Sequence, residues 1–230
     1  MILYMLTSSH LHNLKRKREK EEELSSKSSN IDEKTNKNWS GLYNSENDVY
    51  SVDNHIYFKG DVNRNNVYKL QEEIQNITNH YSESKNSSPG LNISPKPIYL
   101  HLNTYGGYLD AGWVAVDFIR NSTIPIYTIV EGRCASAGTL MSIVGKKRYM
   151  TRSSRMLIHQ LSGGMWGKMN ELEDSYKDCK DEMKDIVSLY VKYTNMKAFD
   201  IKEYLKKDRW WNMSKCKSRG LVDEEWKNSI

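Results

Sequence analysis

Ser136 is the residue of this sequence best placed to act as a nucleophile. It lies in the run Gly132-Arg133-Cys134-Ala135-Ser136-Ala137-Gly138, between a predicted strand and a predicted helix. Small neighbours let a substrate backbone approach closely, and free N–H groups at the start of a helix favour the negative charge of a tetrahedral intermediate. A serine at this position commonly does no more than cap the helix. Both interpretations stay open from this segment alone.

Two further residues have side chains suited to acid–base chemistry. His159 follows the apolar run Met156-Leu157-Ile158, which would place it at the carboxyl edge of a parallel sheet, where ligands of open α/β sheets bind. Asp208 precedes Trp210-Trp211, two aromatic side chains that could shield its carboxylate from water and hold it toward an imidazole. The simpler interpretations are a structural histidine and an ordinary charged surface.

The pair Gly106-Gly107 stands between another predicted strand and helix. Two glycines in a tight turn expose backbone N–H groups, which can form an oxyanion hole or a nest that binds phosphate. The third glycine of a dinucleotide-binding fingerprint is missing, and no GxxxxGK[ST] motif occurs. Nucleotide binding by this chain is therefore not expected.

The elements that must position these residues alternate between strands and helices. Short apolar runs predict the strands, apolar spacings of three and four predict the helices, and residues 82–97 are predicted to form a loop. This alternation indicates an α/β fold of βαβ units, with a parallel sheet and helices packed outside it. Strands are predicted at 56–58, 98–102, 126–130, 149–150 and 156–158, and helices at 66–81, from 107 onward, 137–144 and 169–196.

The longest predicted helix, 169–196, would be near 40 Å long at about 1.5 Å per residue. That exceeds what one small domain needs to cover its sheet, so we expect the helix to project into a partner, with Met183 and Val187 at the contact. A long helix wrapped on its own domain fits the same periodicity. The apolar positions are Leu172, Tyr176, Cys179, Met183, Ile186, Val187 and Tyr190.

Composition limits the remaining function classes. The 34 Lys and Arg and 29 Asp and Glu leave a net charge of +5, spread along the chain apart from Lys15 to Arg18, which argues against a nucleic-acid partner. Cys134, Cys179 and Cys216 stand at long spacings without a CxxC motif, which argues against disulfides and zinc. No apolar run reaches the roughly 18 residues that cross a bilayer.

We therefore expect a soluble, cytoplasmic protein in a reducing compartment, with no membrane partner and no evident organelle-targeting signal. Residues 1–45 are dominated by Lys, Glu, Ser and Asn, a composition that cannot bury enough apolar surface to repay the entropy of ordering. The prediction is a disordered low-complexity tail at 1–45 and one folded domain at 46–230.

Five segments, taken in order, resemble the proteolytic subunit of the Clp protease family over about residues 53–228. Each motif is permissive by itself, but the order and separations are those of the family. The resemblance implies an α/β fold of the ClpP/crotonase type, with repeated βαβ units and a projecting handle helix. The segments are Leu102-Asn103-Thr104-Tyr105-Gly106-Gly107, Cys134-Ala135-Ser136-Ala137-Gly138, Met156-Leu157-Ile158-His159-Gln160, Lys207-Asp208-Arg209 and Gly220-Leu221-Val222-Asp223.

The resemblance also implies a serine endopeptidase without a metal or a cofactor in this chain. It makes Ser136 the nucleophile, His159 the general base and Asp208 the residue that orients the histidine, with the backbone N–H groups of Gly107 and Ala137 as the oxyanion hole. Substrate would be unfolded polypeptide that lies as an added strand along residues 162–167, with Gly163, Gly164 and Met165 as substrate-binding residues.

The implied partners are further copies of this chain, in two stacked heptameric rings joined by the handle helices, and a Clp ATPase that uses ATP to unfold substrates. Three features depart from the family pattern: Tyr105 and Leu161 replace prolines, and residues 82–97 enlarge a loop. Residues 1–45 do not resemble the family's axial gate, so docking of an ATPase stays open. The tryptophan pair and the Asn- and Lys-rich composition resemble viral members of the family.

Two other functions fit part of this pattern. Crotonases share the expected fold and hold a thioester enolate of coenzyme A with paired backbone N–H groups, but they need no Ser-His-Asp set. A catalytically silent ring subunit would support active paralogues without hydrolysing peptides. The presence of Ser136, His159 and Asp208 counts against both.

Overall fold

The fold was obtained as a computed structural model, which describes residues 48–87 and 94–227. The predicted tail at 1–45 lies outside the described residues, so the predicted domain boundary at residue 46 stays a prediction. Within the described ranges, no helix combines the length and the apolar character needed to span a membrane.

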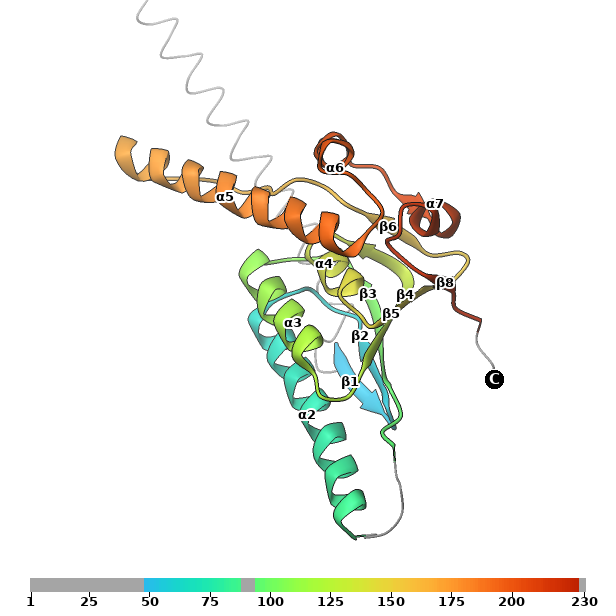
Figure 1. The fold of residues 1–230 in the computed structure, drawn as a ribbon. Helices are drawn as coiled ribbons and strands as arrows, with labels where there is room; N and C mark the ends of the chain where they lie inside the picture. Colours follow the sequence, from blue (N-terminus) through green and yellow to red (C-terminus); the bar gives the residue numbers. More distant parts are fainter. Residues whose placement is uncertain (1–47, 88–93, 228–230) are drawn as a thin grey trace, which may run out of the picture. The chain divides into compact units, whose positions relative to one another are not determined.

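One sheet of eight strands organises the described part of the chain (Figure 1). Its main path is β1-β2-β3-β4-β5-β8, while β6 pairs with β4 and β7. Every pair is parallel except β1–β2 and β6–β7, so the predicted parallel sheet is confirmed apart from these two pairs. The strands are β1 (Val49–Val52), β2 (His55–Phe58), β3 (Ile98–Thr104), β4 (Ile126–Ala135), β5 (Lys147–Met150), β6 (Arg155–Leu157), β7 (Trp211–Asn212) and β8 (Glu224–Glu225).

The antiparallel start of the sheet has a local cause. Strands β1 and β2 pair from Val52 to His55, so only two residues connect them, and Asp53 adopts φ 54° in that turn. Such a short connection joins antiparallel neighbours, whereas parallel strands need a crossover. The sequence prediction included β2 but not the strand before it.

Six helices are described, and four of them match predicted segments. Helix α2 continues to Ser87, so the prediction that a loop begins at 82 is wrong. Serines 82, 84 and 87 donate hydrogen bonds to carbonyls one turn earlier, which lets this polar stretch remain helical. The helices are α2 (Arg64–Ser87), α3 (Leu109–Asn121), α4 (Ala137–Ile143), α5 (Met169–Tyr193), α6 (Ala198–Leu205) and α7 (Met213–Ser218).

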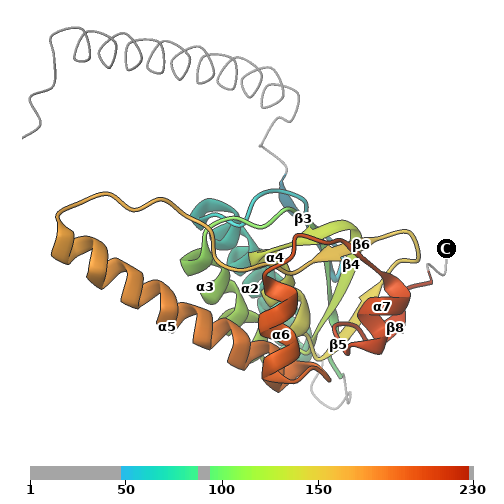
Figure 2. The ribbon, with the colours of Figure 1, turned by 90° about the horizontal axis from the view of Figure 1, so that it is seen from above.

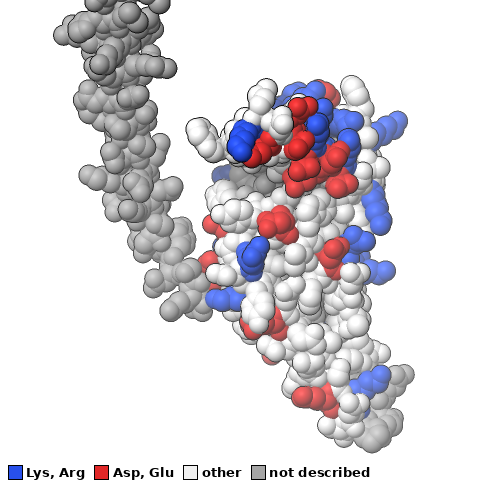
Figure 3. Space-filling view, turned by 90° about the vertical axis from the view of Figure 1, so that its left-hand side faces the viewer, with Lys and Arg blue, Asp and Glu red and all other residues white. Residues whose placement is uncertain are grey.

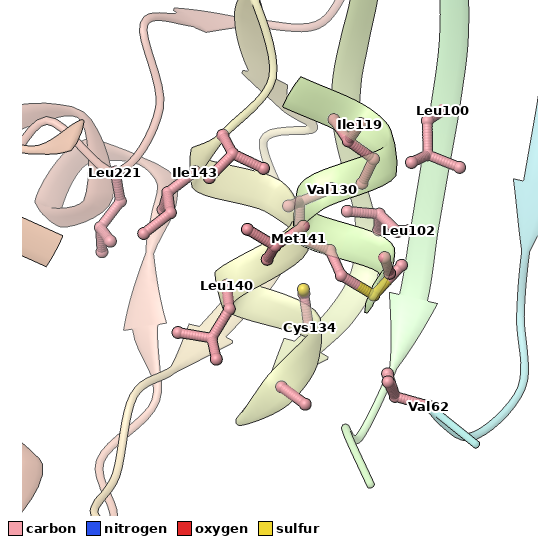
Figure 4. Close-up of a cluster of buried hydrophobic side chains, with 14 of the residues drawn as sticks. Val62, Leu100, Leu102, Ile119, Val130, Cys134, Leu140, Met141, Ile143 and Leu221 are labelled. Carbon is pink, nitrogen blue, oxygen red and sulfur yellow. The ribbon is translucent and has the colours of Figure 1, made fainter. Parts of the chain in front are cut away.

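The core lies between the sheet and helices α2, α3 and α4. Side chains alternate along β3, so Leu100 and Leu102 point into the core and are fully buried. Every residue of α4 is buried, and Figure 4 shows Met141 and Ile143 among side chains from the strands. Burial of each large aliphatic side chain contributes about 1.5–3 kcal/mol. Helix α4, which follows Ser136 directly, is therefore held firmly in place.

The Gly220-Leu221-Val222-Asp223 motif has a structural role in this fold. The Arg148 guanidinium on β5 forms an ion pair with the Asp223 carboxylate and donates a 2.7 Å hydrogen bond to the Gly220 carbonyl. Leu221 and Val222 are buried. The motif therefore anchors the C-terminal segment against the sheet.

Helix α5 extends beyond the rest of the described chain, which confirms the projecting helix (Figures 1 and 2). Its buried residues all lie toward its C-terminal end, whereas Tyr176 is 57% exposed. The prediction that Val187 meets a partner is wrong, because Val187 is buried in the core of its own subunit. Met183 is partly buried against that core, and its contact with a partner stays a prediction. The free surface of α5 is instead its N-terminal half.

Charge on the projecting helix is mixed. Figure 3 shows Lys and Arg side chains interspersed with Asp and Glu on the face that carries the free end of α5. Lys177 lies 3.4 Å from Glu173 and 3.3 Å from Asp174. This face therefore carries charges of both signs rather than a stripe of one sign.

Candidate active site

Ser136 occupies the single residue between the end of β4 and the start of α4. Its backbone has φ 52° and ψ −127°, a conformation that costs a residue with a side chain about 1–3 kcal/mol. Two contacts hold it there: its N–H donates to the Leu157 carbonyl at 3.0 Å, and its own carbonyl accepts from the Thr139 N–H at 2.9 Å. The Ser136 hydroxyl forms no capping hydrogen bond, which removes the interpretation of this serine as a helix cap.

The glycine pair lies directly against this turn. A Cβ atom on Gly106 would lie 2.6 Å from the Ser136 Cβ, and a Cβ atom on Gly107 would lie 2.3 Å from the Val62 carbonyl oxygen. Both glycines also have positive φ, 97° and 153°. Glycine is therefore required at both positions, because a side chain would clash with Ser136 at position 106 and with the Val62 backbone at position 107.

His159 reaches the same place through the pairing of two parallel strands. Ala135 at the end of β4 is in register with Leu157 at the end of β6, so Ser136 and His159 both follow the paired ends of neighbouring strands. Both are half-buried. One pocket is lined by Gly107, Leu109, Ser136, Ala137, Leu140, His159, Gln160, Leu161, Ser162, Ile186 and Tyr190.

The pocket thus brings together four of the five predicted catalytic and oxyanion residues: Ser136, His159, Gly107 and Ala137. Within the described part of the chain, no hydrogen bond joins the Ser136 hydroxyl to the His159 ring. Such bonds are often long without substrate and tighten in the Michaelis complex. Ser136 and His159 therefore share a pocket, but the histidine does not hold the serine hydroxyl in a hydrogen bond that would activate it as a nucleophile.

Asp208 stands apart from this group. It is exposed between α6 and β7, and among the described residues it forms no hydrogen bond with His159. The nearest backbone link is the Gln160 N–H, which donates to the Leu205 carbonyl at 2.8 Å and ties the histidine segment to the end of α6. The structure thus brings the two segments together without placing the carboxylate against the imidazole.

The expectation that two tryptophans shield Asp208 is wrong for this structure. Trp211 is buried in the core, where β7 pairs with β6. Trp210 instead contacts the Tyr105 ring edge-on at 6.0 Å and lies under the Arg133 guanidinium at 4.6 Å. The two aromatic rings therefore pack elsewhere and leave the carboxylate in water.

Every residue of the predicted substrate-binding segment, 162–167, is exposed, and the segment forms no strand in the described chain. A Cβ atom added to Gly163 or Gly164 would meet nothing within 4 Å, while Met165 is 44% and Trp166 101% exposed. A strand needs a hydrogen-bonding neighbour, and this subunit offers none to the segment. Its pairing with substrate stays a prediction.

The chemistry of the described site is that of hydroxyl, imidazole and backbone N–H groups. No group of three or more His, Cys, Asp or Glu side chains is arranged to hold a metal ion within the described residues. Burial raises the pKa of the Cys216 thiol to about 12 and raises the pKa of Cys134 as well. Both thiols are therefore protonated near neutral pH and are poor nucleophiles.

Sequence reasoning missed the role of Thr139 and Tyr190. Tyr190 was predicted only as part of the apolar face of its helix, but it lines the pocket, and its hydroxyl lies 2.6 Å from the Thr139 Oγ1. The signal was present, because a buried tyrosine hydroxyl needs a hydrogen-bonding partner. The sequence could not identify that partner.

Comparison with known proteins gives one consistent result. Residues 90–228 match the Clp protease family. The ATP-dependent Clp protease proteolytic subunit 2 of Treponema pallidum is 34% identical over 134 residues, 57% of this chain and 67% of that protein. The corresponding subunit 1 of Chlamydia pneumoniae is 32% identical over 132 residues, 56% of this chain and 69% of that protein.

The fold has a counterpart among solved structures. A ClpP1 mutant from Listeria monocytogenes superimposes with a TM-score of 0.65, over 76% of this chain and 92% of that one. The two sequences are 21% identical across the match, so this likeness concerns the fold alone.

Proposed function

The chain belongs to the Clp protease family, and from that premise we propose that it is a serine endopeptidase with Ser136 as its nucleophile. The family and the α/β fold of the ClpP/crotonase type inferred from the motifs are confirmed. The observation that supports the nucleophile is the strained Ser136 turn, whose hydroxyl is not used for capping and which shares a pocket with His159.

In the proposed reaction, the Ser136 oxygen attacks the carbonyl carbon of a peptide bond while His159 takes the serine proton. The histidine then returns that proton to the departing amine as the C–N bond breaks. Water, deprotonated by the same histidine, attacks the acyl-enzyme, which releases the carboxylic acid and restores the serine. No metal, cofactor or redox step is required.

Two backbone N–H groups would stabilise the oxyanion. Ala137 is the first residue of α4, so its N–H has no acceptor within the helix. The bridge between Val62 and the glycine loop uses the Gly106 carbonyl and the Tyr108 N–H, which leaves the Gly107 N–H available. Both residues line the Ser136 pocket, which supports their role as the oxyanion hole.

Asp208 is proposed as the residue that orients His159, on the family motif that it matches. Asp208 is exposed and forms no hydrogen bond with His159 among the described residues, so the carboxylate must move toward the imidazole, while the Gln160–Leu205 backbone bond ties the histidine segment to the end of α6. The same exposure favours one alternative, a catalytically silent ring subunit, because an unoriented histidine is a weak general base.

The proposed substrates are unfolded polypeptides that bind as an extended strand along 162–167, where no neighbouring strand is present among the described residues. We propose that copies of this chain assemble into stacked heptameric rings through the exposed half of α5, with any ATP used by a partner Clp ATPase. Tyr176, exposed on that half, supports a contact there.

The decisive experiment is labelling of the purified full chain with a fluorophosphonate probe, followed by mass spectrometry of the modified peptide. We expect the label on Ser136 and its loss in Ser136→Ala. Ser142→Ala is the matched control, because Ser142 lies on the same buried helix with a hydroxyl that has no partner among the described residues. An unlabelled wild-type protein that still assembles would instead support the silent subunit.

A further inference from the structure

A line of hydroxyl groups leads from helix α5 to the backbone of Ser136. The Tyr190 hydroxyl lies 2.6 Å from the Thr139 Oγ1, and the Thr139 Oγ1 donates a 2.6 Å hydrogen bond to the Ser136 carbonyl oxygen. Both side chains are buried, with Thr139 0% and Tyr190 2% exposed. Tyr190 also lines the pocket that contains Ser136 and His159.

The direction of each hydrogen bond in this line is determined. A carbonyl oxygen only accepts, so the single proton of the Thr139 hydroxyl goes to Ser136. The Tyr190 hydroxyl must then donate to Thr139. Burial raises the pKa of Tyr190 well above its ordinary range, so this group keeps its proton under all working conditions. Tyr190 therefore donates to Thr139, and Thr139 donates to the Ser136 carbonyl oxygen.

The Ser136 carbonyl at the end of this line belongs to the same peptide unit as the Ala137 N–H. Because a peptide unit is planar and trans, the Ser136 C=O and the Ala137 N–H point in opposite directions, and fixing one fixes the other. A hydrogen bond to the carbonyl also polarises the peptide and strengthens its N–H as a donor. Tyr190 and Thr139 thus act on the N–H of Ala137, a residue that lines the pocket.

We propose that Tyr190 and Thr139 are positioning residues that aim the Ala137 N–H at the oxyanion of the transition state. The inference rests on the proposed function, since it assigns these residues to the reaction at Ser136. Neither side chain would touch substrate. Their effect would pass through the Ser136–Ala137 peptide. The orientation of this peptide is set by the Ser136 backbone, and its φ of 52° and ψ of −127° are a conformation that a residue with a side chain does not keep unaided.

A second threonine, Thr128 on β4, provides a matched control because it also bonds to helix α4. At the C-terminal end of that helix, the Thr128 Oγ1 donates a 2.7 Å hydrogen bond to the Ser142 carbonyl, and Thr128 is fully buried like Thr139. Loss of the Thr128 hydroxyl removes its one buried hydrogen bond, to a carbonyl of α4, whereas loss of the Thr139 hydroxyl removes two, one to the Ser136 carbonyl and one with Tyr190. Only the Thr139 bond reaches the peptide that contains the Ala137 N–H.

The test compares Tyr190→Phe, Thr139→Val, Thr139→Ser and Thr128→Val in the assembled protein. We expect Tyr190→Phe and Thr139→Val to lower kcat about tenfold with KM within twofold of wild type, less than the 10²–10³ lost with a direct oxyanion donor. A peptide boronic acid, which mimics the tetrahedral anion, should bind these variants weaker by a similar factor. Thr139→Ser keeps the hydroxyl and should restore both values.

The melting temperature and fluorophosphonate labelling of each variant separate the outcomes. Thr128→Val should lower the melting temperature while keeping kcat, and Thr139→Val, which loses two buried hydrogen bonds, should lower both. Equal loss of kcat in the two valine variants, or wild-type kcat and boronate affinity in Tyr190→Phe, would overturn the inference and leave the serine chemistry standing. A wild-type protein that neither labels nor hydrolyses peptides would overturn the proposed function, and this inference with it.

Discussion

Gly106 approaches Ser136 so closely that a Cβ atom on the glycine would lie 2.6 Å from the Cβ of the serine. The same atom would lie 2.8 Å from the Ala135 carbonyl oxygen, so both obstacles belong to rigid parts of the chain. The glycine loop and the serine turn, which are far apart in sequence, therefore form one wall of the pocket. Each constrains which residues the other position tolerates.

Gly106→Ala should consequently separate the two segments. The added methyl group clashes with Ser136, and φ 97° is unfavourable for alanine, so we expect a loss of about 1–3 kcal/mol in stability. The rate of fluorophosphonate labelling should fall at least about tenfold with it, because the oxyanion donors move. Urea denaturation and labelling kinetics measure the two effects. Gly163→Ala, where the methyl group has open space, controls for the stability change.

Asp208→Asn tests the third member of the proposed triad. In chymotrypsin-like proteases the corresponding change leaves the histidine in the wrong tautomer and costs about 10⁴ in kcat, and we expect a similar loss here. Steady-state hydrolysis of a fluorogenic peptide by the assembled protein measures it. Asp200→Asn on helix α6 removes a nearby carboxylate and should leave kcat within about twofold. A loss below roughly tenfold in Asp208→Asn would identify that residue as an ordinary surface charge.

Tyr176→Asp tests the proposed contact through α5. Tyr176 is exposed in the single subunit, so the substitution should leave the fold intact and break the assembly, because an unpaired charge buried at an interface costs several kcal/mol. Sedimentation velocity should show species smaller than the wild-type oligomer, with a melting curve that is still cooperative. Val187→Asp offers the contrast, since Val187 lies in the core and its replacement should unfold the subunit itself. An unchanged oligomer in Tyr176→Asp would exclude this part of α5 from the contact.

The free energy of unfolding should decrease as the pH falls, because His55 and Glu131, which both lie beside His101 on the sheet, then take up protons. His55 Nδ1 lies 2.9 Å from His101 Nε2, and His101 Nδ1 lies 2.9 Å from a Glu131 carboxylate oxygen. Burial, together with the charge of His101, lowers the pKa of His55, and the hydrogen bond from His101 lowers the pKa of Glu131. Both groups bind protons more readily in the unfolded chain, so both contribute stability that is lost as the pH falls.

The loss should begin below the ordinary histidine value of about 6.5 and deepen below the ordinary glutamate value of about 4.3. Urea unfolding at pH 7.5, 5.5 and 4 measures it. His55→Phe keeps a ring to stack on Tyr99 and should flatten the upper part of the decline, while Glu131→Gln should flatten the lower part. If the free energy of unfolding fell with pH at the wild-type slope in both variants, other groups would control the loss of stability in acid.

Much of this protein could be predicted from its sequence because the decisive signals are local. Apolar runs predicted strands at 98–102 and 126–130, which β3 and β4 contain and extend, and the spacing of apolar residues identified α5. The small residues around Ser136 and the pair Gly106-Gly107 indicated tight turns. Their order along the chain was enough to indicate the family before any contact was known.

What the sequence left open depends on contacts between distant segments. Whether the Ser136 hydroxyl caps α4 was decided by its lack of a capping hydrogen bond in a turn that the Leu157 carbonyl and the Thr139 N–H hold from two sides. Whether Val187 faces a partner was decided by how α5 packs on the core, because periodicity gives the apolar face of a helix but not where that face ends. Trp210 packs against Tyr105, and Trp211 pairs with β6, so neither ring covers the exposed Asp208. Local pattern fixes the type of each element, and only tertiary packing decides which side chains meet.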